Sequence, residues 1–193
     1  MNIKYLKSLR KKLGVQLRPE ELNVIIKVLE KKTPCNFLIF GLGKDTPLWN
    51  RVNKKGRTVF LENMKEWFDK VIEKNPKTEV YMVKYTTKRR SWKKLLKNKK
   101  KLFLKLPKEI IETKWDVILV DAPRGWKDDQ PGRMQSIYMA SKLIKKKGHI
   151  FVHDCWREVE AVYSDKFLLR KNLVKEIKGS RVCPTGLRHY HIK

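Results

Sequence analysis

Two aspartates each stand where an apolar, strand-like stretch ends, a position from which carboxylates can do chemistry. Asp121 follows the continuous apolar run Val117–Val120, and Asp154 ends the stretch 149–154. In a parallel sheet these positions share the carboxyl edge, where open α/β sheets bind ligands, and neighbouring strands lie roughly 5 Å apart. The pair could therefore converge on one cation or one substrate hydroxyl. The alternative is that each acid only hydrogen-bonds the turn after its strand.

His153 adds an imidazole beside the two carboxylates. Oxygen and nitrogen ligands with open positions suit Mg²⁺, Mn²⁺ or Co²⁺, so Asp121, His153 and Asp154 are the candidate metal ligands and catalytic residues. Adjacent residues of a regular strand point to opposite faces, but this rule relaxes at a strand end. The alternative for His153 is a buried histidine that hydrogen-bonds the backbone.

A glycine-bearing turn follows the first predicted buried strand. Gly41 and Gly43 would let a ligand approach the backbone closely, and Glu62 ends the next strand about 20 residues later, where a ribose diol is held. Thr46 replaces the third glycine of the dinucleotide fingerprint, which argues against a pyrophosphate and tolerates S-adenosylmethionine. Asp45 is a further candidate for cofactor binding, or the cap of the next helix. A plain tight turn remains the alternative.

Three arginines follow the acidic strand ends. Arg124, Arg133 and Arg157 could each clasp a carboxylate through two hydrogen bonds, as an acidic sugar would require. The alternative is ordinary ion pairing, for instance of Arg157 with Glu158 or Glu160 on a helix surface.

Strand-like and helix-like stretches alternate along most of the chain. Runs of β-branched and aliphatic residues are typical of strands buried on both faces. The predicted strands are 36–40, 57–61, 80–85, 117–120, 149–154, 173–177 and 187–192, and the predicted helices between them are 46–53, 64–74, 133–145 and 156–169. This order predicts an α/β fold with a Rossmann-like, mainly parallel sheet, an antiparallel terminal strand and helices on both faces.

Two segments stand outside this alternation. Residues 1–33 predict two helices that form a helical cap, and residues 34–193 then form a single domain. Within that domain, residues 86–107 are a lysine-rich insertion. The insertion could grip phosphates or carboxylates, or could simply present a solvated helix face.

Composition limits the classes of partner and setting. With 47 Lys+Arg against 20 Asp+Glu, the 193-residue chain carries a net charge of +27, which suggests nucleic acid, an anionic membrane face or an acidic glycan as partner. The three cysteines form no CxxC pair, which excludes the common zinc patterns and favours a reducing compartment. Without a signal-like apolar segment or a run of membrane-spanning length, the sequence predicts a soluble, cytoplasmic protein.

Several of these stretches together resemble the plant glucuronoxylan 4-O-methyltransferase family. The resemblance rests on blocks 36–45, 59–62, 115–125, 131–134 and 152–154, with Arg157 and Glu160. It implies a Rossmann-like methyltransferase that transfers a methyl group from S-adenosylmethionine to the 4-hydroxyl of a glucuronate residue in a glycan, with divalent-metal assistance. The chain differs from the plant pattern in its shorter length, in having no membrane anchor and in its lysine-rich segment 88–101, which replaces a cysteine-bearing insertion.

The resemblance also suggests roles for the candidate residues. Gly41, Gly43, Asp45, Glu62 and Asp121 would hold the cofactor; Asp121, His153 and Asp154 would act on the hydroxyl and bind the metal; Arg124, Arg133 and Arg157 would bind the uronate. The expected partner is then a glycan that contains uronic acid.

Two other functions remain open. The charge would suit an RNA methyltransferase, but Asp121-Ala122-Pro123-Arg124 is not the Asn/Asp-Pro-Pro-aromatic motif of base methylases, so nucleic acid is the less favoured partner. The chain could also be a non-catalytic, basic glycan-binding module on a cofactor fold.

Overall fold

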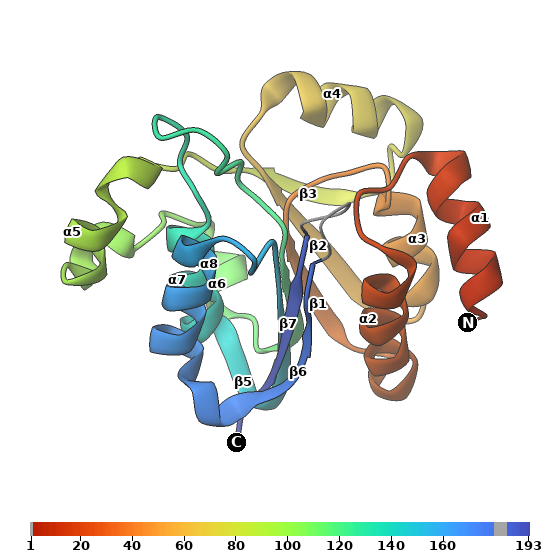
Figure 1. Cartoon of the computed structure of the whole chain (residues 1–193). Helices are drawn as coiled ribbons and strands as arrows, with labels where there is room; N and C mark the ends of the chain where they lie inside the picture. Colours follow the sequence, from red (N-terminus) through yellow and green to blue (C-terminus); the bar gives the residue numbers. More distant parts are fainter. Residues whose placement is uncertain (1, 180–184) are drawn as a thin grey trace.

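A seven-stranded sheet forms the centre of the computed structural model, which describes residues 2–179 and 185–193 (Figure 1). The strand order is β3-β2-β1-β4-β5-β7-β6, and all neighbours are parallel except where β7 pairs with β5 and β6. The predicted fold class is therefore confirmed. The strands are β1 Asn36–Phe40, β2 Arg57–Glu62, β3 Glu79–Met82, β4 Trp115–Val120, β5 Ile144–His153, β6 Leu173–Ile177 and β7 Leu187–His191.

Helices cover both faces of this sheet, as Figure 1 shows. One face carries α1 Ile3–Leu13, α2 Pro19–Lys32, α3 Thr46–Val52 and α4 Lys65–Lys74. The other carries α5 Trp92–Leu96, α6 Lys108–Glu112, α7 Met134–Leu143 and α8 Glu158–Ser164. Short helical turns, Arg89–Ser91, Lys99–Leu102, Asp165–Leu169 and Arg170–Asn172, complete this second layer.

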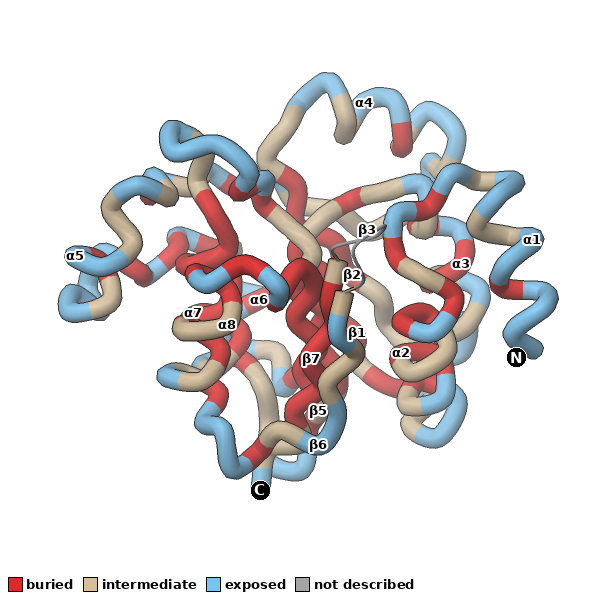
Figure 2. Tube along the Cα trace, in the orientation of Figure 1, coloured by how far each residue is buried: buried red, intermediate tan, exposed pale blue. Residues whose placement is uncertain are grey.

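The central strands are buried on both faces because successive side chains alternate between the two helical layers. In β1, Phe37 and Ile39 pack toward α1–α4, whereas Leu38 and Phe40 pack toward α5–α8, and all four are at most 3% exposed. Figure 2 shows the same burial along the neighbouring strands. Burying one such side chain contributes about 1.5–3 kcal/mol, which is why these apolar runs specify the middle of the sheet.

The two N-terminal helices lie over the first of these faces. Leu22, Ile25, Ile26 and Leu29 form the apolar stripe of α2 and are fully buried against the sheet. The division of the chain into a cap of residues 1–33 and a domain of residues 34–193 stays a prediction.

Sequence periodicity misplaced the boundary between α7 and β5. The helix was predicted to continue to Lys145, but it ends at Leu143, and β5 begins at Ile144. Ile144 pairs with Trp115, and a register irregularity then separates this pair from the regular ladder. Tertiary strand pairing therefore overrides a stretch of lysines with good helix propensity.

Two further boundaries differ from the prediction. The helix predicted to run to Leu169 is α-helical only to Ser164, and a π-type turn follows over Asp165–Leu169. The third strand ends at Met82 rather than Tyr85. Across residues 2–179 and 185–193, no helix is both long enough and apolar enough to span a membrane.

Candidate functional site

A cavity of about 470 Å³ opens at the carboxyl edge of the sheet. Its walls include the turn after β1, the end of β2 and the loops that follow β4 and β5. Eight of the ten predicted site residues line it: Gly41, Gly43, Asp45, Glu62, Asp121, Arg124, Arg133 and Asp154. His153 and Arg157 are outside this lining and contact the acid pair directly.

The glycine turn leaves room that side chains would fill. Gly41 has a φ of +123°, and a Cβ there would lie 3.1 Å from the Cβ of Ala122. A Cβ on Gly43 would lie 2.5 Å from Oδ1 of Asp45. Thr46 closes the turn, because its hydroxyl accepts a hydrogen bond from Gly43 N at 3.2 Å. The backbone is therefore open to close approach by a ligand.

Glu62 lies at the end of β2, as predicted. Its carboxylate accepts hydrogen bonds from backbone N–H groups of the loops after β1 and after β2, which form this wall of the cavity. Oε2 accepts a hydrogen bond from Leu42 N at 3.0 Å, and Oε1 accepts from Asn63 N and Met64 N at 2.7 and 2.8 Å. An ionised carboxylate offers about four acceptor sites, so capacity for a ligand hydroxyl remains on Oε2.

Asp45 lies beside this turn, and its Oδ2 accepts a hydrogen bond from Trp49 Nε1 at 2.8 Å. Burial, followed by the nearby charge of Asp121, raises the pKa of Asp45 to about 6. A cationic ligand would favour its ionised form.

The two predicted acids form ion pairs with the same arginine. Arg133, from the start of α7, places Nη2 3.0 Å from Asp121 Oδ1 and 2.8 Å from Asp154 Oδ2. Its Nη1 donates to the carbonyl oxygen of His153 at 2.6 Å. Asp154 has a φ of 61°, which breaks the strand alternation and brings its side chain toward Asp121. The predicted convergence of the two carboxylates is therefore present.

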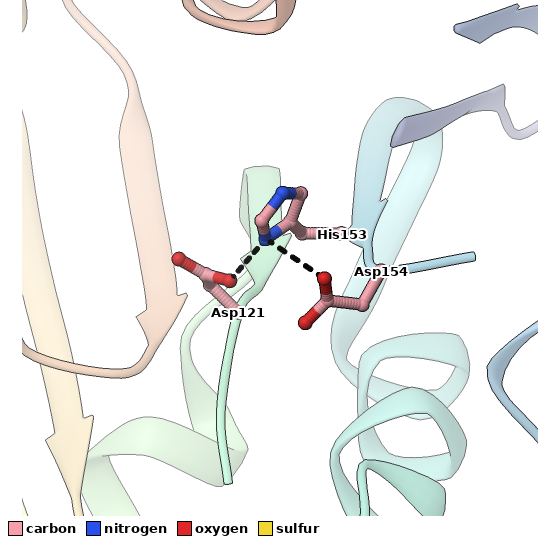
Figure 3. Close-up of side chains that lie close together, drawn as sticks. All are labelled: Asp121, His153 and Asp154. Carbon is pink, nitrogen blue, oxygen red and sulfur yellow. Dashed lines mark hydrogen bonds and ion pairs between the residues drawn. The ribbon is translucent and has the colours of Figure 1, made fainter. Parts of the chain in front are cut away.

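His153 points at the same acid pair (Figure 3). Its Nδ1 lies 2.7 Å from Asp121 Oδ1, and its Nε2 lies 3.6 Å from Oε2 of Glu21 on α2. Burial disfavours the charged imidazole, but the carboxylates of Asp121, Glu21 and Asp154 outweigh it and raise the pKa of His153 to about 10. At neutral pH His153 is consequently a cation whose Nδ1 donates a hydrogen bond to Asp121 Oδ1.

Arg157 supports the acid pair from the other side. Its Nη2 donates to Asp154 Oδ2 at 3.0 Å, and its Nε lies 3.1 Å from Glu160 Oε2. Burial opposes ionisation of Asp154, yet Arg133, His153 and Arg157 together lower its pKa. Arg133 and Arg157 are only 5% and 7% exposed, so ion pairing within the protein describes them better than a free clamp. Arg124 is exposed at the cavity rim.

Sequence reasoning missed three contributors to this site. Glu21 is fully buried against His153, and its only sequence signal was its place in the first turn of α2. The loop between α1 and α2, residues 14–17, forms one wall of the cavity. Trp126 lies at the rim, in a stretch that was interpreted as a polar loop.

The predicted metal ligands partly fit a divalent cation. Ligand atoms of Asp121, His153 and Asp154 lie within 4.8 Å of one another, and buried Oδ1 of Asp154 accepts no hydrogen bond from the described residues. However, Arg133 lies between the two carboxylates, and the raised pKa of His153 opposes metal ligation by its ring. A metal ion at this position would have to compete with the guanidinium and the imidazole proton.

Comparison with known proteins identifies the family to which the chain belongs. A family model described as IRX15/IRX15L/GXM matches residues 20–104 and 101–182. Glucuronoxylan 4-O-methyltransferase 2 of Arabidopsis thaliana is 40% identical over 90% of this chain and 64% of its own length. Arabinogalactan O-methyltransferase 1 of the same plant is 37% identical over 78% of this chain and 61% of its own length. The chain thus spans less than two thirds of these relatives.

Solved structures agree on the fold. A SAM-dependent O-methyltransferase from Thermotoga maritima superimposes with a TM-score of 0.58 at 12% identity, covering 91% of this chain and 66% of that one. At such low identity the similarity concerns the fold alone.

Proposed function

The chain belongs to the IRX15/IRX15L/GXM family, and from that premise we propose that it is an S-adenosylmethionine-dependent O-methyltransferase acting on the 4-hydroxyl of a glucuronate residue in a glycan. The observation that carries the proposal is the single cavity in which the glycine turn, Glu62 and Asp121 face one another. The named relatives, which methylate plant glycans according to their names, support the choice of acceptor.

In this proposal the donor lies along the carboxyl edge of β1 and β2. The backbone of Gly41 and Gly43 would admit it, Oε2 of Glu62 could accept a hydrogen bond from a ribose hydroxyl, and the Asp45 carboxylate would suit its positive charge. When bound, S-adenosylmethionine supplies an activated methyl group on a sulfonium. The positive charge of that group favours a site with several carboxylates.

Asp121 is the proposed base. It lines the cavity with 22% of its side chain exposed, whereas His153 is already protonated at neutral pH. As the sugar oxygen bonds to the methyl carbon and the carbon–sulfur bond breaks, Asp121 takes the hydroxyl proton, and S-adenosylhomocysteine leaves. Arg133 and His153 hold the Asp121 carboxylate in place, so they are positioning residues.

The proposal also includes assistance by a divalent metal ion. Asp121, Asp154 and His153 would hold Mg²⁺, Mn²⁺ or Co²⁺, and the ion would supply Lewis acidity toward the hydroxyl. Because Arg133 lies between the two carboxylates, metal binding at this place requires Arg133 to withdraw. If calorimetry detects no binding of Mn²⁺ to the purified protein and added Mn²⁺ does not change turnover, the metal part of the proposal fails.

For the acceptor, Arg124 is the proposed clamp of the uronate carboxylate. Arg124 is exposed at the cavity rim, and it forms no ion pair with any residue in the ranges 2–179 and 185–193. Arg133 and Arg157, predicted as further clamps, are occupied by the acid pair and Glu160 and are assigned to positioning instead.

The experiment is methyl transfer to oligosaccharides that end in glucuronate, with the product identified by mass spectrometry. Asp121→Ala and Asp154→Ala should lose most turnover while still binding S-adenosylhomocysteine. If both variants keep full turnover, the assigned roles are wrong.

Two further measurements distinguish this function from the two alternatives. Methyl incorporation into RNA, with strongly salt-dependent binding, would point to an RNA methyltransferase. The absence of any S-adenosylmethionine binding in calorimetry would leave a non-catalytic, basic glycan-binding module.

A further inference from the structure

Two tryptophan rings stand exposed beside the cavity. Trp126, in the loop between β4 and α7, is 56% exposed, and Trp156, just before α8, is 45% exposed. Their ring centroids are 5.6 Å apart, with 46° between the ring planes. Large aromatic rings usually bury most of their surface, so an adjacent exposed pair indicates a surface that binds something.

This aromatic pair is fixed directly to the acid pair. The guanidinium carbon of Arg157 lies 5.2 Å from the centroid of the Trp126 ring, and Arg157 donates to Asp154 at 3.0 Å. Trp156 follows Asp154 by two residues, and its ring packs against that of Trp126. Any molecule lying on the rings would therefore be next to the proposed catalytic centre.

The loop that carries Trp126 is held in place. Gln130 Oε1 accepts hydrogen bonds from the backbone N–H groups of Trp126 and Lys127 at 2.7 and 3.0 Å. Gly132 N donates to the carbonyl oxygen of Arg124 at 2.9 Å, which closes the base of the loop. The position of the ring is thus set before a ligand arrives, which reduces the entropy lost on binding.

We propose that Trp126 and Trp156 form a stacking platform for a neutral pyranose ring of the acceptor glycan, next to the uronate that is methylated. A pyranose ring has an apolar face of C–H groups that suits an aromatic surface, while its hydroxyl rim stays hydrated. Arg124, at the same rim, would meet the carboxylate of the neighbouring uronate. This inference rests on the proposed function for the location of the reacting sugar and adds the residues that recognise the rest of the chain.

Two measurements test the platform on the whole protein. The first is calorimetric binding of a xylo-oligosaccharide with a glucuronate branch to protein saturated with S-adenosylhomocysteine. Trp126→Ala and Trp156→Ala should each weaken this binding about tenfold, and Trp126→Phe should restore most of it because an aromatic face remains. Phe103→Ala is the matched control, since Phe103 is 55% exposed but lies outside the cavity lining.

The second measurement separates recognition from chemistry. Trp126→Ala should raise KM for the oligosaccharide about tenfold while kcat and the affinity for S-adenosylmethionine change less than threefold. Unchanged oligosaccharide affinity in the Trp126→Ala/Trp156→Ala double variant would overturn the inference, as would an equal loss in the Phe103→Ala control or no oligosaccharide binding by the unaltered protein. Tryptophan-dependent sugar binding without methyl transfer would support the platform and reject the proposed reaction, so the two failures are distinguishable.

Discussion

At the scale of single residues, Arg133 organises the charges of the site. One guanidinium contacts both acids and the carbonyl oxygen of His153; Arg133, His153 and Asp154 are buried, whereas Asp121 is partly exposed to the cavity. A planar fork can make these contacts simultaneously, whereas an ammonium group is a single point charge. The arginine therefore keeps two carboxylates close together without mutual repulsion.

Arg133→Lys should therefore destabilise the fold even though the charge is kept. We expect a loss of about 1–3 kcal/mol in the free energy of unfolding, the range for leaving a buried hydrogen-bonding group without its partner, measured by denaturant titration. Arg124→Lys at the exposed rim is the control and should change stability by less than about 0.5 kcal/mol. Equal stability of the two variants would contradict the role given to Arg133.

His153 makes stability depend on pH in the alkaline range. Its pKa is raised from 6.5 in the unfolded chain to about 10 in the folded protein, so its stabilising contribution is complete below about pH 6.5 and is lost as pH rises through about 10. The free energy of unfolding should fall between pH 7 and 9, and His153→Gln should flatten that slope. An identical slope in the variant would mean that His153 is neutral in the folded state.

The sequence identified the two acids but not the residues that bind and orient them. Asp121 and Asp154 were identifiable because each follows an apolar strand, a local pattern. Glu21 reaches His153 from a helix more than one hundred residues earlier, and the buried pairing of Arg133 depends on the packing of α7. Such contacts arise from tertiary structure, so the local sequence carries little information about them.

At the scale of elements, the turn between β1 and α3 has little room for added volume. Gly43→Ala would place a methyl group 2.5 Å from Asp45 Oδ1. We expect S-adenosylmethionine binding, measured by calorimetry, to weaken about tenfold, because the Asp45 carboxylate proposed to face the donor must move away from its present position. Pro47→Ala, at an exposed position in the first turn of α3, is the control and should bind normally.

The strands were predicted better than the helices that end beside them. β1, β2 and β4 each contain a short continuous apolar run that is buried on both faces of the sheet, a pattern typical of central parallel strands. The first residues of β5 include three consecutive lysines, two of which are exposed. They are held in the sheet because Ile144 pairs with Trp115 of β4 and Lys147 N donates to the carbonyl oxygen of Ile192, just after β7. Propensity cannot reveal that pairing, since it depends on a distant segment.

At the scale of the whole molecule, the net charge of +27 is concentrated partly in one segment. Between β3 and β4 the chain forms short helical turns whose leucines are buried while its lysines project outward, and the segment extends to one side in Figure 1. We define the lysine cluster as Lys97, Lys100 and Lys101, all of which are exposed. Such a surface would attract a long acidic glycan.

Removing this charge should weaken binding of a polymer more than binding of a short sugar. Changing the three residues of the lysine cluster to Gln should reduce affinity for a polyuronate about tenfold at low salt, with a shallower salt dependence. The control changes Lys54, Lys55 and Lys77 to Gln, which are equally exposed at the amino edge of the sheet. Equal losses would mean that only net charge matters. The cytoplasmic location stays a prediction that fractionation of the full chain can check.

The wall contributed by residues 14–17 has a practical consequence for defining a minimal enzyme. A fragment beginning at residue 34 would retain all seven strands, yet its donor pocket would be open to water on one side, and His153 would lose the carboxylate of Glu21. The fragment would also expose the face of the sheet that α2 covers, so a lack of methyl transfer by it would not count against the proposed function of the longer chain.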